Sequence, residues 1–564
     1  MDSRLTLAVF LWGALASVAA YPCFKKGGVS NSQWLRIFVC FVLVLAAALP
    51  VWRLRSLEYN GEINVDESSI LAQAMRYMDD PIPWRSVNGG SGGPLNTWVL
   101  FWAPLVGAKL TYLVARVTGL VCTLLTIVGT ALGVRELVGS RVALLLTLPM
   151  TLLLCGTLNL DFVHFSSEQL PSAILAWAVW LGLRQVRRIS TLRAFMLGLL
   201  TGALPFTKLQ VAPAGVFVFM CAFLIGALSS APRETKLRAG LLIGLGGLIV
   251  PTCILVPVAM CGAWSDFLEF YLMEGLRYKN TLTAATPSAL QFLLRGSADF
   301  KTYWTSFCGV ALVGFIVSLV GSTGEEKKRR MPWMIGVAGF TVYLLLMTHL
   351  ATRTGMGFPH YLMLLIAPIS LWVAACLGDP CSLMDRHREM LDEDLTSRSR
   401  VLWLSAAVSG VVFLQSLTFL AEYRAAPQFV RNWGKPEHPL VPLILRFASA
   451  TDRMFIWGWA PKFHVLTGIP PASRFVSNGL LTGLGDLPEL YHRRLKEDLE
   501  KSKPRLILDA TEEFRWPTWP PGFLAGHQAM PELAEITFRD YRQVQRIEVK
   551  PGGQPFIIFE KRDK

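Results

Sequence analysis

The stretch "WLRIFVCFVLVLAAALPV", residues 34–51, decides the class of fold. It carries one charged residue, Arg36, and is otherwise almost wholly apolar. A run of this length suits a helix that crosses the hydrocarbon core of a bilayer. The composition agrees, because a chain of 564 residues with 52% hydrophobic and 17% charged residues and a mean hydropathy of +0.43 is too apolar for a soluble protein of that length. The sequence therefore predicts a membrane protein.

Apolar runs of similar length recur along the first 420 residues and predict about twelve helical spans. Proline interrupts several of them, so the number of spans is approximate while the class is not. The runs are 4–20, 34–51, 112–132, 141–158, 170–186, 192–207, 211–229, 239–261, 304–321, 332–350, 360–377 and 401–420.

The basic residues indicate a topology rather than nucleic-acid binding, although the net charge is +14. They fall in every second connection between the apolar runs, as the positive-inside rule requires of cytoplasmic loops. We therefore expect no nucleic-acid partner. The basic connections hold Lys25, Lys26 and Arg36; Arg135 and Arg141; Arg184, Arg187 and Arg188; Arg233, Lys236 and Arg238; residues 325–330; and residues 385–400.

The other connections are then expected on the outer side of the membrane. The N-terminal stretch "LTLAVFLWGALASVAA", residues 5–20, also resembles a secretory signal. Its removal would place every basic loop on the wrong side, so we expect a retained first span. The prediction is a multi-pass protein of the cell inner or plasma membrane, in contact with membrane lipids. Its outer segments are 52–94, about 159–169, 262–303, 351–359 and everything after 420.

Cysteine usage and short motifs exclude several classes of chemistry. Nearly all of the ten cysteines lie in or beside apolar runs, and residues 52–94 and 421–564 contain none, so no disulfide framework is indicated. The sequence has no CxxC, HExxH or glycine-rich phosphate loop followed by Lys and Ser or Thr. It therefore gives no positive sign of zinc or nucleotide chemistry.

Beyond residue 420 the apolar runs stop, and a domain-sized segment rich in Pro, Trp and charge begins. Three stretches read as buried strands: "RMFIWGW" (453–459), "RLILDA" (505–510) and "QPFIIFEK" (554–561). The stretch "LPELYHRRLKEDLEKS" (487–502) reads as a helix. We expect a transmembrane region over 1–420 and an extracytoplasmic soluble α/β domain over 421–564.

The outer connection 52–111 is long for a loop without a span of its own, which is typical of functional segments. After Glu67, apolar residues mark one face at helical spacing and predict an amphipathic helix on the membrane surface. The stretch "NTWVLFWAPLVG" (96–107) is too short to span and predicts a second surface helix.

The adjacent acids Asp66 and Glu67 have two interpretations. Asp is a favoured helix cap, and first-turn acids complement the helix dipole. The other interpretation is functional, because further ionisable residues are expected at the same outer face. They are Asp161, His164, Glu168, Lys208, Arg353 and His360. Each alone is explained by packing, capping or snorkelling, whereas together they are typical of a site that binds a phosphate and activates a hydroxyl.

Several motifs resemble those of the GT-C glycosyltransferases, which include protein O-mannosyltransferases and the aminoarabinose transferases that modify lipid A. "DESSILAQAMRYM" (66–78), "GGPLNTWVLFWAPLVG" (92–107) and "ARVTGL" (115–120) are similar to their first outer loop. "HFSSEQLP" (164–171) and "GFPHYLMLLIAP" (357–368) are similar to later outer turns. "FIWGWAPKFHVLTGIPPASRFV" (455–476) is similar to a segment in the soluble tail of some bacterial members.

The resemblance implies a sugar donor linked to polyprenyl phosphate, and transfer to a hydroxyl of a lipid, glycan or protein acceptor outside the cytoplasm, with inversion. It implies that Asp66 is the base and Glu67 its partner. Glu168 is the next candidate for the site, with Asp161 and His164 as further substrate-binding residues. Three basic residues are expected to contact the phosphate of the donor, only because of their residue type and their expected position at the outer face: Lys208, Arg353 and His360.

Two departures from the family pattern put an aminoarabinose donor in doubt. Gly93-Pro94 stands where the family has Pro-Pro, and the preceding Lys of the lipid A transferases is absent. Some family members use a divalent metal ion, but the first outer loop has no clear Asp-x-Asp pair, so a metal cofactor is left open. A polytopic transporter and a non-catalytic envelope-assembly protein remain as alternatives.

Overall fold

The computed structural model describes most of the chain. The described residues are 3–25, 29–90, 92–229, 231–277, 288–320, 325–353, 358–378, 398–425, 438–476, 489–511, 513, 526–548 and 554–563. The predicted basic connection 385–400 lies outside them up to residue 397, as does Lys26.

The chain divides into two compact units, each built from three stretches of sequence. The first, called the helical unit, comprises Met1–Leu57, Gly119–Thr252 and Ala285–Trp433. The second, called the mixed unit, comprises Glu58–Thr118, Cys253–Ala284 and Gly434–Lys564. The predicted boundary at residue 420 marks the end of the transmembrane region and the start of the soluble domain. It does not coincide with the division into compact units, and it stays a prediction.

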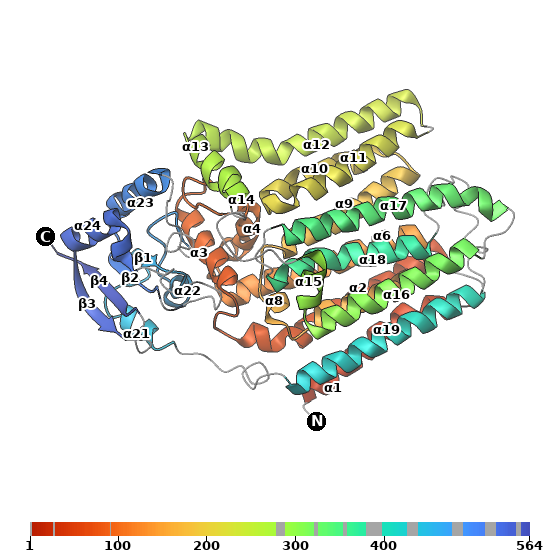
Figure 1. The fold of residues 1–564 in the computed structure, drawn as a ribbon, viewed down its shortest axis with the longest axis horizontal. Coiled ribbons are helices and arrows are strands. Elements are labelled where there is room, and N and C mark those ends of the chain that lie inside the picture. The colour runs from red at the N-terminus through yellow and green to blue at the C-terminus, as the bar shows by residue number, and fades with distance from the viewer. Residues whose placement is uncertain are drawn as a thin grey trace. The chain divides into compact units, whose positions relative to one another are not determined.

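Long helices make up the helical unit, and each of the predicted apolar runs falls on one of them (Figure 1). The bounds are α1 Ser3–Phe24, α2 Asn31–Glu58, α6 Tyr112–Val138, α7 Ala143–Gly156, α9 Gln169–Arg187, α10 Thr191–Ala203, α11 Ala212–Leu228, α12 Arg233–Met260, α16 Ala298–Val320, α17 Glu325–Thr352, α18 Met363–Leu377 and α19 Arg398–Ala425, with a short helix, α15 Ala289–Arg295. The residues of α6 before Gly119 and of α12 after Thr252 belong to the mixed unit. Short helical turns between them are α8 Leu160–Val163, η2 Leu204–Phe206, η3 Leu209–Val211 and η5 Pro359–Leu362.

Within the described residues, 8 helices are long and apolar enough to cross a membrane. The helices α7 and α10 are apolar but shorter, which is one reason why this number is below the twelve predicted spans. A chain with this many apolar helices is an integral membrane protein, because each long apolar helix satisfies its own backbone hydrogen bonds in lipid. The predicted class of polytopic helical membrane protein is confirmed.

The centre of the helical unit is α18, which is buried along nearly its whole length and packs on α16, α17, α9 and α7. Polar groups in this core have partners: Tyr303 donates from Oη to the Ile366 carbonyl over 2.7 Å. Elsewhere, α10 and α12 cross so closely that a Cβ at Gly198 or Gly202 would overlap the backbone of α12. Small residues at such a crossing are typical of helices packed in a membrane.

The mixed unit contains a four-stranded sheet in the order β1-β2-β4-β3. The strands are β1 Met454–Trp457, β2 Leu506–Asp509, β3 Tyr541–Ile547 and β4 Phe556–Lys561. The pair β1–β2 is parallel, and β4 is antiparallel to both β2 and β3. The three predicted strands are confirmed, and so is the helix predicted at 487–502 over its described part, Glu489–Ser502. The predicted C-terminal α/β character is confirmed with them. Strand β3 was not predicted, because its sequence is largely polar and exposed.

Short helices form the rest of the mixed unit, and one of them, α24, packs against β3. They are α3 Val65–Asp79, α4 Pro94–Trp98, η1 Val99–Phe101, α5 Trp102–Leu105, α13 Trp264–Phe267, η4 Leu268–Met273, α14 Glu274–Arg277, α21 Leu440–Ile444, α22 Lys462–Thr467, α23 Glu489–Ser502, η8 His527–Ala529 and α24 Pro531–Asp540. The predicted amphipathic helix after Glu67 corresponds to α3. The predicted helix at 96–107 is broken into α4, η1 and α5.

Candidate active site

In the mixed unit, Asp66 and Glu67 lie in the first turn of α3. The residue that caps this helix is Asn64, whose side-chain oxygen accepts a hydrogen bond from the Asp66 N–H over 3.0 Å. The interpretation of Asp66 as the cap is therefore wrong, although both acids do lie where the helix dipole favours negative charge. The Asp66 side chain is half-buried.

Glu67 is completely buried and paired with Arg116, near the start of α6. Arg116 donates from Nε to Glu67 Oε1 over 3.0 Å and from Nη2 to Oε2 over 2.8 Å. The same guanidinium also donates to the carbonyls of Tyr59 and Gly61, which fixes the chain that leads into α3. A bidentate pair of this kind is rigid, so Glu67 holds the start of α3 in place.

Two further acids of the mixed unit differ in charge state. Burial raises the pKa of Glu62 above its ordinary value, and the carboxylates of Glu67 and Asp66 add to the rise. Burial also acts to raise the pKa of Glu513, but the hydrogen bond from His438 and the charge of Lys462 outweigh it and lower this pKa to about 2. Glu62 is therefore biased towards its neutral form, while Glu513 stays ionised.

In the helical unit, the turn between α7 and α9 repeats the local geometry of the α3 start. Asn159 caps the short helix α8, and its side-chain oxygen accepts from the Asp161 N–H over 3.0 Å. Asp161 is half-buried, as Asp66 is. His164 ends α8 and is fully buried, and its Nδ1–H donates to the Leu160 carbonyl over 2.9 Å. That bond leaves Nε2 of His164 with a lone pair, and within the described residues Nε2 has no hydrogen-bond partner.

Glu168 and Lys208 form a buried ion pair in the same unit. Lys208 also donates to the Ser167 hydroxyl over 2.8 Å and lies 4.5 Å from the centre of the Tyr361 ring. Only Oε1 of Glu168 takes part in the pair, and within the described residues Oε2 has no hydrogen-bond partner. The predicted residues Glu168 and Lys208 are therefore brought together, 40 residues apart in sequence.

His360, in η5, lies beside the turn that carries Asp161 and His164. Its Nδ1 is 3.7 Å from Asp161 Oδ1, and its ring centre is 5.8 Å from that of His164. The ring stacks on Phe358, which fixes its plane. Asp161, His164 and His360 thus form one cluster of a carboxylate and two imidazoles, called the histidine cluster below. Arg353 follows α17 and is exposed, and among the described residues it is not brought into this cluster.

Two positioning residues were missed by the sequence analysis. Arg116 is one. The other is Arg53, in α2, whose Nη2 donates to the carbonyls of Leu154 and Phe162 over 2.5 and 3.4 Å. These carbonyls flank the turn 155–161, so Arg53 holds both ends of the segment that carries Asp161. The signal that could have found both is a lone arginine inside or beside an apolar run, since such residues are costly in lipid and need partners.

These geometries define a class of protein. The chain is a polytopic membrane protein whose candidate side chains lie at helix starts and in turns between helices, with two capped aspartates and two buried acid–cation pairs.

No protein-family model and no curated protein sequence matches this chain. Among solved structures, it is similar to ArnT from Cupriavidus metallidurans in the apo state, with 12% identity and a TM-score of 0.39 over 94% of this chain and 98% of that one. It is also similar to the oligosaccharyltransferase of Archaeoglobus fulgidus tethered to an acceptor peptide with an NVT sequon, with 12% identity and a TM-score of 0.41 over 91% of this chain and 74% of that one. A structure of the same enzyme in complex with Zn and sulfate has 12% identity and a TM-score of 0.39, over 83% and 68% of the two chains.

Both neighbours are GT-C glycosyltransferases, the group that the sequence motifs resemble. TM-scores below 0.5 at this identity assign no activity to the chain. An assignment of function therefore depends on the chain's own residues.

Proposed function

We propose that this protein is a membrane glycosyltransferase that moves a sugar from a polyprenyl-phosphate donor to a hydroxyl of a lipid, glycan or protein acceptor. The reaction takes place on the extracytoplasmic face of the cell inner or plasma membrane, the side on which we place residues 421–564. The acceptor oxygen attacks the anomeric carbon, the bond from that carbon to the phosphate oxygen breaks, and the configuration inverts. The products are the glycosylated acceptor and polyprenyl phosphate.

The observation that carries this proposal is the contrast between Asp66 and Glu67. Glu67 is buried with both oxygens bound by Arg116, so it is committed to holding the helix start. Asp66 is half-buried on the same rigid turn, with its backbone fixed by the Asn64 cap. A partly exposed carboxylate on a fixed helix start suits a general base for an acceptor hydroxyl. We assign Asp66 this role.

The leaving phosphate needs positive charge rather than a strong acid, because a phosphate is already a good leaving group. We assign Lys208 to it directly, and His360 through the metal ion proposed below. Lys208 is held by Glu168 and Ser167, so its position is fixed, while Glu168 limits how much of its charge is available. Arg353 is a weaker candidate, since its exposed side chain is not held in this way.

We assign the histidine cluster a divalent metal ion. Its fit rests on His164, whose buried Nε2 has a lone pair and no hydrogen-bond partner within the described residues. The imidazoles of His164 and His360 suit an ion such as Zn²⁺ or Mn²⁺, because one ligand nitrogen of each lies within 4.8 Å of the other. When bound, the ion would supply positive charge for the phosphate oxygens of the donor.

The positions of the candidate residues favour an enzyme over a transporter. Transporters place their ionisable binding residues near the middle of the bilayer, within broken helices. We instead expect Asp66, Asp161, Glu168 and Lys208 at the outer boundary of the membrane, because the basic connections place their segments on the outer side.

The proposal is tested by comparing the envelope glycans, lipids and glycoproteins of cells with and without this protein by mass spectrometry. We expect one sugar modification to disappear with the protein and to return with the wild-type chain but not with Asp66→Asn. If no glycan, lipid or glycoprotein changes mass, the proposed function is wrong. If Asp66→Asn restores the modification fully, the assignment of Asp66 as the base is wrong.

A further inference from the structure

The segment that precedes α4 in the mixed unit is held in an uncommon backbone conformation. Trp84 has φ of 62°, in the left-handed region that a bulky side chain rarely adopts, and Gly89 and Gly90 have φ of 73° and 54°. The Trp84 indole is buried, with ring centres 4.7 Å from Phe267 and 5.0 Å from Tyr271. A conformation of this kind persists only where the surroundings determine it.

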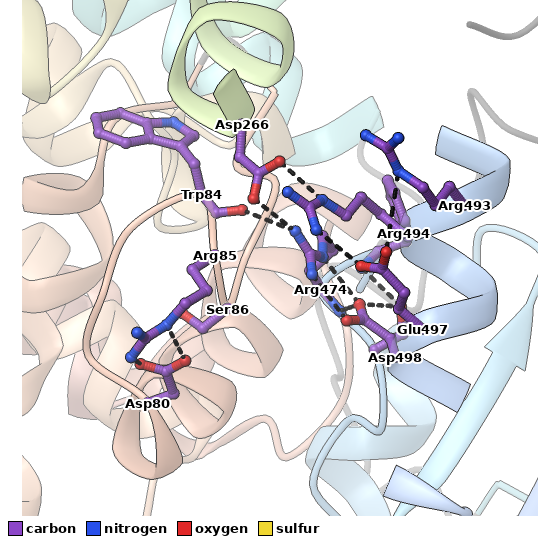
Figure 2. A network of polar contacts seen from close by, with 12 residues as sticks. Asp80, Trp84, Arg85, Ser86, Asp266, Arg474, Arg493, Arg494, Glu497 and Asp498 are labelled. Carbon is purple, nitrogen blue, oxygen red and sulfur yellow. Dashed lines mark hydrogen bonds and ion pairs between the residues drawn. The ribbon is translucent and has the colours of Figure 1, made fainter. Parts of the chain in front are cut away.

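Arg474 is one source of that constraint, and Figure 2 shows it between two carboxylates from different parts of the mixed unit. Its Nε and Nη2 donate to the two oxygens of Asp498, in α23, over 3.0 and 2.9 Å. Its Nη1 donates to Asp266, in α13, over 3.0 Å and to the Trp84 carbonyl over 3.5 Å. Arg494 binds the other oxygen of Asp266 over 2.9 Å, so both buried carboxylates have cationic partners.

The backbone of Arg474 contacts the same segment. Its carbonyl accepts from the Asn88 N–H over 3.1 Å, and its own N–H donates to Asp498 over 2.8 Å. One residue of the C-terminal stretch therefore contacts main-chain groups at both Trp84 and Asn88. Nearby, Arg453 pairs with Asp79, the last residue of α3, over 2.6 Å. The C-terminal stretch thus binds both the end of α3 and the segment that leads into α4.

We propose that Arg474 is a positioning residue, through which the C-terminal α/β part sets the conformation of residues 84–90 and so the placement of α3 with Asp66. This inference rests on the proposed function for its catalytic consequence. It gives the C-terminal part a role in the reaction that requires no contact with substrate. Buried ion networks contribute little net stability but fix one arrangement over others, which is the property that positioning needs.

The test compares Arg474→Met with Arg505→Met in the full-length protein. Arg505 also lies between two carboxylates, Glu560 and Asp563, and Arg542 still pairs with Glu560 when Arg505 is replaced, as Arg494 does with Asp266. Arg505 is more exposed than Arg474, so it controls for the loss of a paired arginine and not for the loss of a buried one. The first readout is amide hydrogen exchange over residues 84–98, which reports local opening. We expect exchange about tenfold faster in Arg474→Met, with β1, β2 and β4 still protected, and wild-type exchange in Arg505→Met.

The second readout is the rate of sugar transfer. We expect kcat to fall about tenfold in Arg474→Met with little change in KM, because a misplaced base slows chemistry without removing binding groups. Asp498→Asn, which keeps the side-chain volume, should move both readouts in the same direction by less. The inference is overturned if residues 84–98 of Arg474→Met exchange at the wild-type rate. It is also overturned if the strands of the sheet lose as much protection as residues 84–98.

The two readouts separate this inference from the proposed function. Exchange does not depend on catalysis, so faster exchange over 84–98 in a protein without transferase activity would leave Arg474 as the residue that holds the segment and refute the proposed function. Faster exchange with unchanged kcat would refute the positioning role and leave the proposed function intact.

Discussion

The turns at Asn64 and Asn159 are built alike in two separate units of the molecule. Each has the sequence Asn-x-Asp, and in each the asparagine side chain accepts the aspartate N–H over 3.0 Å. Each is followed by a fully buried glutamate paired with a buried cation, Glu67 with Arg116 and Glu168 with Lys208.

The two turns differ in what is left unsatisfied. Both oxygens of Glu67 are bound by Arg116, whereas Oε2 of Glu168 and Nε2 of His164 have no hydrogen-bond partner within the described residues. Beside the first turn, Oε2 of Glu62 also has none within those residues. Buried polar atoms are usually paired, so each of these atoms needs an explanation, and we propose a bound ion at His164. We propose that the aspartate after each cap has a different role, Asp66 as a base in the first turn and Asp161 as a substrate-binding residue in the second.

The largest expected effect comes from replacing the two aspartates. Asp66→Asn should lower kcat about 10³-fold, the usual contribution of a general base, with the protein still folded. Asp161→Asn should act mainly on KM for the donor, because its proposed role is in binding. Steady-state kinetics on both purified variants would check this. Equal losses of kcat in the two variants would contradict the different roles proposed for Asp66 and Asp161.

The buried glutamates give the next largest effect. In Glu67→Gln, an amide NH₂ faces a donor of Arg116, so we expect a loss of about 3 kcal/mol or more in the free energy of unfolding. Glu168→Gln can keep an oxygen towards Lys208 and turn the amide to the side of the unpartnered Oε2, so it should lose less. Denaturant unfolding in detergent measures both. A larger loss in Glu168→Gln would mean that the Lys208 pair, not the Arg116 pair, is the tighter one.

We expect the protein to bind a metal ion at the second turn, through the histidine cluster. We expect bound Zn²⁺ or Mn²⁺, measured by mass spectrometry of the purified protein, to fall at least about tenfold in His164→Ala and His360→Ala. His492→Ala is the control, since His492 also lies near a carboxylate, Glu532, at 3.1 Å. Metal content that is unchanged in both cluster variants would refute the metal assignment.

The two caps should have smaller and similar effects on stability. Asn64→Ala and Asn159→Ala each remove one capping hydrogen bond, which typically costs about 1 kcal/mol. Only Asn64→Ala should also lower kcat, since it loosens the turn that carries the proposed base. Thermal unfolding and kinetics together check this. A drop in kcat for Asn159→Ala alone would reverse the assignment of the two turns.

The smallest effect concerns Glu62, which has no counterpart in the second turn. Its pKa is raised in the folded protein, so the folded state binds the proton more tightly than the unfolded state does. Protonated Glu62 therefore stabilises the fold below the ordinary pKa of a glutamate, and this stabilisation is lost as the pH rises through the raised pKa. Glu62→Gln should remove that loss and make the variant slightly more stable than wild type near neutral pH. Melting temperatures between about pH 4 and pH 8 test the sign. Lower stability of Glu62→Gln at neutral pH would show that the carboxylate form is the favoured one.

Much of the fold can be predicted from the sequence, because apolar length and periodicity are local signals. The run at 34–51 predicts α2, and the apolar spacing after Glu67 predicts α3. Strand β3 is missed because pairing with β4, rather than apolar residues of its own, makes it a strand. Propensity cannot report a partner that is distant in sequence.

The candidate site was predicted by residue type but not by pairing. Glu168 and Lys208 were both named, yet their ion pair depends on tertiary packing. Arg116 was overlooked as the partner of Glu67, 49 residues away. The Asn-x-Asp repeat is present in the sequence at 64–66 and 159–161 and would have located both caps, since asparagine is a favoured helix cap.

The most direct test of the central claim is a single-turnover assay on the purified protein with a set of polyprenyl-phosphate sugars and a hydroxyl acceptor, with release of polyprenyl phosphate as the readout. We predict that the wild-type protein releases polyprenyl phosphate from one donor class only when the acceptor is present, and that Asp66→Asn, equally folded, does so about 10³-fold more slowly. Release at the wild-type rate by Asp66→Asn would contradict the assignment of the base. No acceptor-dependent release from any donor by the wild-type protein would contradict the proposed function itself.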